Sequence, residues 1–207
     1  MRILIAVPTY ENIYPDTFKS IYDLDKCGHE CLFEFIRGYD VAFARNTIAT
    51  RAIELDADYV FMVDNDVVLP KNALRHLTED IKDVQLGVYA RRTKDAEPGD
   101  DKTVIFHDHV DDWSEKYTVS ELNEFRDKGI YKLLVRGGGM GCALIKTDVF
   151  KQLRFPYFQW VHFMSGVQKH LSEDLFFCDQ CRGYHIPIYT DTRVRCGHII
   201  RYIHNSY

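Results

Sequence analysis

Short apolar runs alternate with stretches of helical periodicity through the first half of the chain, and this alternation limits the fold more than any other feature. Four runs predict strands, and the three stretches between them predict helices. In chain order these are strand 2–7, helix 13–26, strand 30–36, helix 41–55, strand 59–63, helix 71–81 and strand 86–90. Strands that alternate with helices form a mostly parallel sheet with helices on both faces. We therefore expect an α/β fold.

The second half of the chain is less regular. It predicts, in order, a loop over 95–112 with a short strand at 103–106, a helix at 119–128, strands at 131–135 and 142–146, a short helix from 148, a helix at 172–182 and two short strands flanking Thr190-Asp191. No linker rich in Pro, Gly or Ser divides the 207 residues, a length that suits one domain. We expect a single domain, in which a nucleotide-type half at 1–90 precedes a half at 91–207 that shapes a second pocket.

Charge and hydropathy argue against several classes of protein. The chain has 26 Lys and Arg against 31 Asp and Glu, and this net charge of -5 argues against a general nucleic-acid binder. No stretch approaches the roughly 18 apolar residues of a membrane span, and no signal-peptide pattern is present. We therefore expect a cytoplasmic protein with no membrane span, whose six cysteines are reduced thiols.

Asp64, Asn65 and Asp66 follow the apolar run at 59–63 and precede another apolar pair. Two carboxylates one residue apart at a strand end can share Mg²⁺ or Mn²⁺, because these cations prefer oxygen ligands and complete their shell with phosphate oxygens. The alternative is a polar turn between a strand and the next helix. Turn chemistry does not require carboxylates inside so apolar a run, and both interpretations stay open.

Further polar residues follow the other predicted strands. In open parallel sheets, ligands bind beyond the carboxyl ends of the strands. Such positions are occupied by Pro8, Thr9, Tyr10 and Glu11 after the first strand and by Arg37 and Asp40 after the second, with Arg45 on the following helix. These residues are candidates for binding a ligand.

Ser172, Glu173 and Asp174 open a predicted helix. Ser is a good N-cap, and acidic residues in a first turn interact favourably with the helix dipole, which is a purely structural explanation. Alternatively, one of the two carboxylates is a general base for a hydroxyl nucleophile. Spacing alone does not decide between these interpretations.

Cys196-Gly197-His198 follows a predicted strand, and His198 is either a metal ligand or a surface histidine. A zinc site made of Cys178, Cys181, Cys196 and His198 is chemically adequate. However, the first two of these cysteines fall well inside a predicted helix, so the zinc site is a minor alternative.

The segment at 136–141 reads RGGGMG. It lacks the Lys-Ser/Thr of a P-loop and the spacing of a dinucleotide-binding fingerprint. Its glycines permit either the close approach of a substrate or a plain bulged turn between strands.

Four segments resemble glycosyltransferases of the GT-A fold, most closely those of family 2, and they occur along the chain in the same order as in that family. The segment at 41–74, VAFARNTIATRAIELDADYVFMVDNDVVLPKNAL, resembles the family's block of ARN, helix, apolar strand and D-x-D motif. The other three are ILIAVPTYEN at 3–12, GGGMGCALIKTDVF at 137–150 and SEDLFFCDQCRGYHIPIYTDTRVRCGHI at 172–199. They resemble the family's nucleotide-binding turn, its acceptor-side strand and helix, and its E-D helix with a terminal metal-binding histidine.

The resemblance implies a Rossmann-like GT-A domain in which 1–90 binds the nucleotide and 91–207 binds the acceptor. It assigns the nucleotide sugar to Pro8, Thr9, Tyr10, Glu11, Arg37, Asp40, Arg45, Asp64, Asn65, Gly139 and Met140. Within this set, Tyr10 would lie against the nucleobase and Arg45 would approach the diphosphate. Asp64, Asp66 and His198 would hold Mn²⁺ or Mg²⁺, and Asp174, or else Glu173, would be the base of an inverting reaction.

The activity that the resemblance implies is transfer of a sugar from a UDP- or GDP-sugar to an acceptor hydroxyl. The acceptor is open among a glycan, a protein, a lipid and a modified nucleotide such as a hydroxymethylated DNA base. The family's Asp-rich turn that reads uracil is replaced here by Arg37-Gly38-Tyr39-Asp40, with Asp40 as its stand-in. The chain is also short, so a partner or a second copy in a homo-oligomer could complete the acceptor region.

Two other functions compete with this one. A nucleotidyltransferase would share the sheet and the metal, but it would carry a Gly/Arg-rich loop with a lysine after the first strand, and 8–12 has neither. A non-catalytic nucleotide or glycan binder would be expected to lack Asp66 or the Glu173-Asp174 pair, and both are present.

Overall fold

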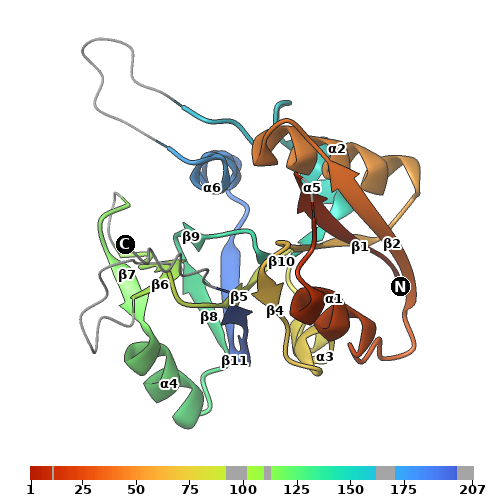
Figure 1. The fold of residues 1–207 in the computed structure, drawn as a ribbon. Coiled ribbons are helices and arrows are strands. Elements are labelled where there is room, and N and C mark those ends of the chain that lie inside the picture. Colours follow the sequence, from red (N-terminus) through yellow and green to blue (C-terminus); the bar gives the residue numbers. More distant parts are fainter. Residues whose placement is uncertain (11, 92–101, 110–112, 162–170, 200–207) are drawn as a thin grey trace, which may run out of the picture.

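The computed structural model describes residues 1–10, 12–91, 102–109, 113–161 and 171–199, which are built around a seven-stranded sheet (Figure 1). The strands are β1 (Arg2–Thr9), β2 (Glu30–Arg37), β3 (Tyr59–Val63), β4 (Val67–Val68), β5 (Val84–Val88), β6 (Lys102–Phe106), β7 (Lys116–Thr118), β8 (Lys132–Val135), β9 (Gly137–Gly138), β10 (Cys142–Lys146), β11 (Ile188–Arg195) and β12 (Gly197–His198). The helices are α1 (Pro15–Tyr22), α2 (Val41–Glu54), α3 (Ala73–Thr78), α4 (Val119–Asp127), α5 (Thr147–Gln152) and α6 (Glu173–Gly183). Within the described ranges, no helix combines the length and apolar character that crossing a membrane requires.

The strand order of the central sheet is β2-β1-β3-β10-β5-β11-β8. β1 pairs in parallel with β2 and β3, and β5 pairs in parallel with β11. Only β10 and β8 run antiparallel to their neighbours in this sheet. The expected α/β fold, a mostly parallel central sheet flanked by helices, is therefore confirmed.

Helices cover both faces of the sheet because its central strands are apolar on both sides. Leu4 of β1 belongs to one buried cluster, together with Ile48 of α2 and Phe150 of α5. Ile5 of the same strand belongs to a second cluster, together with Leu74 of α3. Figure 1 shows the corresponding layers, with α2 and α5 on one side of β1 and with α1 and α3 on the other. Successive residues of a strand point to opposite faces, so a continuous apolar run requires this double cover.

Two small sheets complete the architecture. β12 pairs antiparallel with β4, which places His198 opposite Val67. β6 pairs antiparallel with both β7 and β9. The first of these pairings brings a late segment of the chain beside the residues that follow β3.

The expectation of two short strands around Thr190-Asp191 was wrong, because one strand, β11, runs through both residues. Their polar side chains do not interrupt the strand since each finds a partner inside the fold. Thr190 Oγ1 donates a hydrogen bond to the Leu86 carbonyl at 3.0 Å, and the Asp191 carboxylate accepts one from Arg193 Nε at 3.0 Å. Local sequence does not reveal such partners.

Helices α1 and α3 are shorter than the ranges expected at 13–26 and 71–81. α1 begins at Pro15, a residue suited to the first helical position. α3 ends at Thr78 because the next residue, Glu79, is extended. The strand expected at 103–106 is confirmed as β6, while 95–101 and 110–112 of the expected loop lie outside the described residues.

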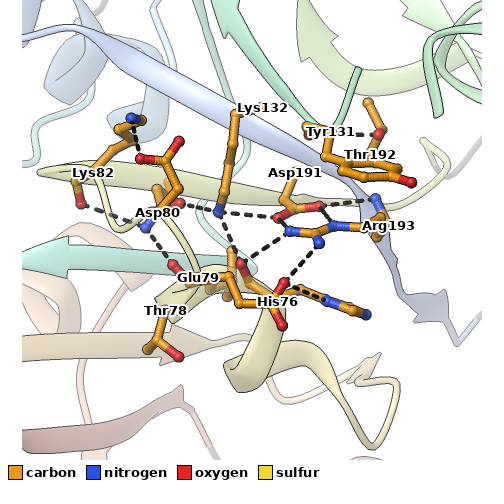
Figure 2. Close-up of polar contacts among 12 residues, drawn as sticks. His76, Thr78, Glu79, Asp80, Lys82, Tyr131, Lys132, Asp191, Thr192 and Arg193 are labelled. Carbon is orange, nitrogen blue, oxygen red and sulfur yellow. Dashed lines mark hydrogen bonds and ion pairs between the residues drawn. The ribbon is translucent and has the colours of Figure 1, made fainter. Parts of the chain in front are cut away.

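Charged side chains also link α3 to the far edge of the sheet (Figure 2). The fully buried Asp191 of β11 lies 3.0 Å from Lys132 Nζ of β8, and it also accepts hydrogen bonds from Arg193. Lys132 Nζ donates to the His76 carbonyl of α3 at 2.9 Å, and Arg193 Nη1 donates to Glu79 Oε2 at 2.7 Å. Burial alone would raise the pKa of Asp191, but Arg193 and Lys132 outweigh it and lower that pKa.

We expect Asp191→Asn to destabilise the protein by about 3–5 kcal/mol at pH 7, because it leaves Lys132 and Arg193 without their buried anion. The lowered pKa means that the Asp191 contribution is present above the unfolded-state value of about 3.9 and is lost as the pH falls through the folded-state value. Denaturant unfolding of both proteins from pH 7 to pH 3 measures this, and the difference between them should shrink in acid.

The control is Asp127→Asn, since Asp127 is exposed on α4 and its ion pair within the described residues is with its neighbour Arg126. This variant should unfold like the wild type. Equal stability of Asp191→Asn and Asp127→Asn would show that the buried network does not stabilise the fold.

Candidate functional site

The carboxyl ends of β1, β2 and β3 lie at one edge of the sheet, and β10 begins at that edge because it pairs antiparallel with β3. The Asp64 N–H donates to the Gly141 carbonyl at 3.0 Å, which joins the turn after β3 to the glycine-rich segment before β10. Asp174, in the first turn of α6, accepts a hydrogen bond from the Met140 N–H. Segments from both halves of the chain therefore meet at this edge.

A cleft of about 600 Å³ opens here. Ten of the residues that the sequence indicated line it: Pro8, Thr9, Tyr10, Asp40, Asp64, Asn65, Asp66, Gly139, Asp174 and His198. Seven further lining residues were not among the predicted site residues: Gly38, Tyr39, Val41, Ala44, Tyr89, Arg91 and Val104. Of the other predicted site residues, Glu11 lies outside the described part of the chain.

Arg45 lies behind the wall of the cleft and is only 1% exposed. Its guanidinium forms ion pairs with Glu173 and Asp174, and its Nη2 lies 2.8 Å from Asp64 Oδ1. Arg45 was expected to approach the diphosphate. The structure corrects this expectation, because the buried guanidinium is enclosed by three carboxylates and does not line the cleft. Its position indicates that it holds the acidic side chains in place.

Burial and charge shift the pKa values in this cluster. Burial alone would lower the pKa of Arg45, but the charges of Asp174, Asp64 and Glu173 outweigh it and raise that pKa. For Asp174, burial is the largest effect and raises the pKa well above its usual value. The charge of Arg45 opposes this rise, while the charges of Glu173 and Asp64 add to it. A carboxyl group with a raised pKa in a cleft is suited to accept a proton.

Glu173 is the less accessible of the two acids in α6. The exposed fraction of its side chain is 6%, against 19% for Asp174. Ser172 caps the helix through a hydrogen bond from the Leu175 N–H, so the purely structural explanation of the Ser172-Glu173-Asp174 sequence also applies. Asp174 alone of the two acids lines the cleft.

Asp66 and His198 face each other in the same cleft. His198 Nε2 lies 3.7 Å from Asp66 Oδ1, and the Ile199 N–H donates to the Asp66 carbonyl at 2.9 Å. His198 Nδ1 lies 2.8 Å from the Ala90 carbonyl, which can only accept, so Nδ1 carries the proton of this bond. This bond directs Nε2 toward Asp66, the arrangement that a metal-binding histidine commonly adopts.

The donor set of Asp66 and His198, with Asp64 nearby, suits Mn²⁺ or Mg²⁺ when ligand oxygens complete the shell. Within the described ranges, no three His, Cys, Asp or Glu side chains are grouped closely enough to hold a metal. An ion would therefore depend on oxygens supplied by a ligand such as a diphosphate.

The alternative zinc site is not supported. Cys178 and Cys181 are buried inside α6, and Cys178 Sγ lies 3.8 Å from the Gly138 carbonyl. Burial raises the pKa of both thiols, which opposes the thiolate form that zinc binds. These cysteines are therefore part of the hydrophobic core.

The cleft continues toward the ends of β1 and β2. Tyr10 is 67% exposed there, and its carbonyl accepts a hydrogen bond from Arg37 Nε at 3.2 Å. Arg37 lines a neighbouring hollow together with Tyr39 and Tyr10 rather than the main cleft. Asp40 caps α2 by accepting a hydrogen bond from the Phe43 N–H at 2.9 Å.

Met140 and Tyr89 depart from the sequence-based expectations in opposite ways. The side chain of Met140 is fully buried, so only its backbone N–H, which bonds Asp174, contributes to the site. Tyr89 was missed, although it directly follows β5 and the rule for carboxyl ends of parallel strands applies to it as well. Its Oη accepts a hydrogen bond from the Gly141 N–H at 2.9 Å.

We expect Arg45→Met to destabilise the protein by about 3–5 kcal/mol near neutral pH, because three carboxylates lose their buried counter-charge. Without Arg45, which opposes the rise, the pKa of Asp174 goes still higher. The folded state then binds more protons than the unfolded state, and its stability falls as the pH rises. Urea unfolding at pH 5 and pH 8 measures this, and the loss should be larger at pH 8. A loss that does not depend on pH would contradict this electrostatic account.

No protein-family model matches the chain, and no curated protein matches it. Solved structures do. A197 from STIV is similar with a TM-score of 0.62 and 20% identity, over 97% of this chain and 87% of that one. GalNAc-T7 with UDP, GalNAc and Mn²⁺ is similar with a TM-score of 0.61 and 11% identity, over 96% of this chain and 44% of that one.

S. aureus TarS 1-349 in complex with UDP-GlcNAc is similar with a TM-score of 0.53 and 13% identity, over 100% of this chain and 62% of that one. The chain thus spans less than two thirds of the TarS and GalNAc-T7 structures. At such low identity the likeness concerns the arrangement of helices and strands. The chain has a GT-A-like fold.

Proposed function

We propose that the protein is a metal-dependent glycosyltransferase that moves a sugar from a nucleotide-diphosphate sugar to an acceptor hydroxyl. One observation carries this proposal: Asp64, Asp66 and Asp174 line a single cleft at the carboxyl ends of the strands. The first two suit a cation bound to a diphosphate, and the third is a carboxyl group with a raised pKa. The proposal agrees with the GT-A-like fold and with the UDP-sugar and UDP ligands named for TarS and GalNAc-T7.

In this proposal the nucleotide lies along the ends of β1 and β2. Tyr10, which exposes its ring at this end, would stack on the base. Arg37 and Asp40 would offer hydrogen-bonding groups to the same end of the donor, and Thr9 and Glu11 would contact the base or ribose.

The diphosphate would lie beside the turn after β3. Asp66 and His198 would hold Mn²⁺ or Mg²⁺ with Asp64 next to them, and a bound ion would neutralise the charge that develops on the leaving diphosphate. The protein orients this turn through two contacts. Arg45 binds the Asp64 carboxylate, and Asn65 Nδ2 donates to the Asn12 carbonyl at 2.8 Å.

Asp174 is the proposed general base. It would take the proton of the acceptor hydroxyl as that oxygen attacks the anomeric carbon and the bond to the diphosphate breaks, which inverts the configuration. Glu173 is more deeply buried against Arg45, so we assign it a positioning role. The acceptor would approach from the half formed by 91–207.

Calorimetric titration with UDP and with GDP, each with and without Mn²⁺, tests the donor site. We expect one of the two nucleotides to bind and its affinity to fall strongly without Mn²⁺. Asp66→Ala should reduce the affinity by at least tenfold, because it removes a proposed ligand of the ion. The same titration also shows whether the nucleobase of the donor is uracil or guanine.

Asp127→Ala is the matched control, because this exposed aspartate belongs to α4 and does not line the cleft. Its affinity for the nucleotide should equal that of the wild type. If the wild type binds neither nucleotide, or binds equally well with and without Mn²⁺, the proposed metal-dependent transferase is wrong.

The variant Asp174→Asn tests whether Asp174 is the general base of the reaction. Release of nucleotide diphosphate from a nucleotide sugar, with water as the acceptor, should slow by about 10²–10⁴-fold while the affinity for the nucleotide is retained. Glu173→Gln should lower the free energy of unfolding and slow the reaction less. A larger rate loss in Glu173→Gln than in Asp174→Asn would reverse the two roles.

A further inference from the structure

Tyr89 lines the same cleft as Asp64, Asp66 and Asp174. Its side chain follows β5, is only 5% exposed and lines the cleft. The ring packs edge-on against His198, with 5.1 Å between the ring centroids. A tyrosine hydroxyl is neutral near pH 7, because its usual pKa is about 10. The Tyr89 hydroxyl therefore keeps its proton.

The proton of this hydroxyl has no acceptor among the hydrogen bonds of the described residues. Tyr89 Oη accepts from the Gly141 N–H at 2.9 Å, and no hydrogen bond within those ranges uses it as a donor. A phenol can accept and donate at the same time. A buried donor without an acceptor is costly, so the O–H of Tyr89 requires an acceptor from solvent or from a ligand in the cleft.

Glycines make room for the phenol. A Cβ at Gly141 would lie 2.7 Å from Tyr89 Oη and 2.8 Å from Asp64 Oδ2. A Cβ at Gly139 would overlap the same hydroxyl and would lie 3.2 Å from Tyr89 Cζ. The glycine-rich segment thus allows close approach of a protein side chain, and Tyr89 Oη is brought beside both Asp64 and the loop whose Met140 N–H bonds Asp174.

We propose that the Tyr89 hydroxyl donates a hydrogen bond to the sugar of the nucleotide-sugar donor. This inference rests on the proposed function. In that function the diphosphate lies beside Asp64 and Asp66 and the attacked hydroxyl lies beside Asp174, so the transferred sugar occupies the space between them. Tyr89 lines the cleft that holds this space, and a sugar hydroxyl or ring oxygen supplies the missing acceptor.

The test compares affinities for a nucleotide and for its sugar conjugate. Wild type, Tyr89→Phe and Tyr117→Phe are titrated with UDP, UDP-glucose, UDP-GlcNAc and UDP-GalNAc, and with GDP and GDP-mannose, in the presence of Mn²⁺. Tyr117 is a matched control because it is also buried, on β7, and does not line the cleft.

We expect Tyr89→Phe to bind the nucleotide diphosphate as the wild type does and to bind the preferred nucleotide sugar about tenfold more weakly. Tyr117→Phe should change neither affinity. The ratio of the two affinities is the decisive quantity, because a general disturbance of the loop at Gly141 would weaken both ligands together.

Gly139→Ala provides a second route if Tyr89→Phe does not fold. Its Cβ would displace the phenol oxygen, which is the nearest atom to it, and the same selective loss of sugar affinity is expected. An unchanged ratio in either folded variant overturns the role of Tyr89 while leaving the proposed function intact. A wild type that binds neither nucleotides nor nucleotide sugars overturns both.

Discussion

The ion pairs of Arg45 with Asp64, Glu173 and Asp174 are the interaction on which the cleft depends. Three acids crowded at one edge of a sheet repel one another, and burial adds a large desolvation cost. One buried guanidinium offsets both effects, because its planar fork presents donors to several carboxylates at once. Helix α2 supplies this buried cation, so that the acid that follows β3 and the two acids of α6 can share it.

The antiparallel strand β10 gives the site its second half. Because β10 lies between β3 and β5, the glycine-rich segment that precedes it reaches the edge where the parallel strands end. The backbone of that segment then contacts each side of the cleft: Met140 N–H bonds Asp174, Gly141 N–H bonds Tyr89, and the Gly141 carbonyl accepts from Asp64 N–H. The position of the proposed catalytic groups therefore follows from the strand order.

Much of the fold could be predicted from the sequence, because periodicity is a local signal. The apolar run at 59–63 became β3, and the helical stripe at 41–55 became α2 with nearly the same ends. The predicted break between two strands at Thr190-Asp191 was wrong, because the partners of Asp191 come from β8 and from its own strand. A polar pair inside a strand is predicted to be a turn unless the partners of its side chains are known.

The candidate site was predictable to the extent that it follows strand ends. Asp64, Asp66 and His198 were found in this way and all line one cleft, whereas Tyr89, at the end of β5, was overlooked. The role of Arg45 was not predictable, because its neighbours Glu173 and Asp174 lie 128 and 129 residues away in the chain. Nothing local to Arg45 distinguishes a cation that binds phosphate from one that is buried among carboxylates.

The sequence by itself determined the alternation of strands and helices, and with it the α/β class and the edge at which polar residues gather. Those properties depend on side-chain periodicity and on chain direction, and both are local features of the sequence. The tertiary structure alone decided which acid lines the cleft, which cation is buried and which hydroxyl lacks an acceptor among the described residues. These properties depend on burial and on contacts between distant segments, and both arise only when the strands assemble.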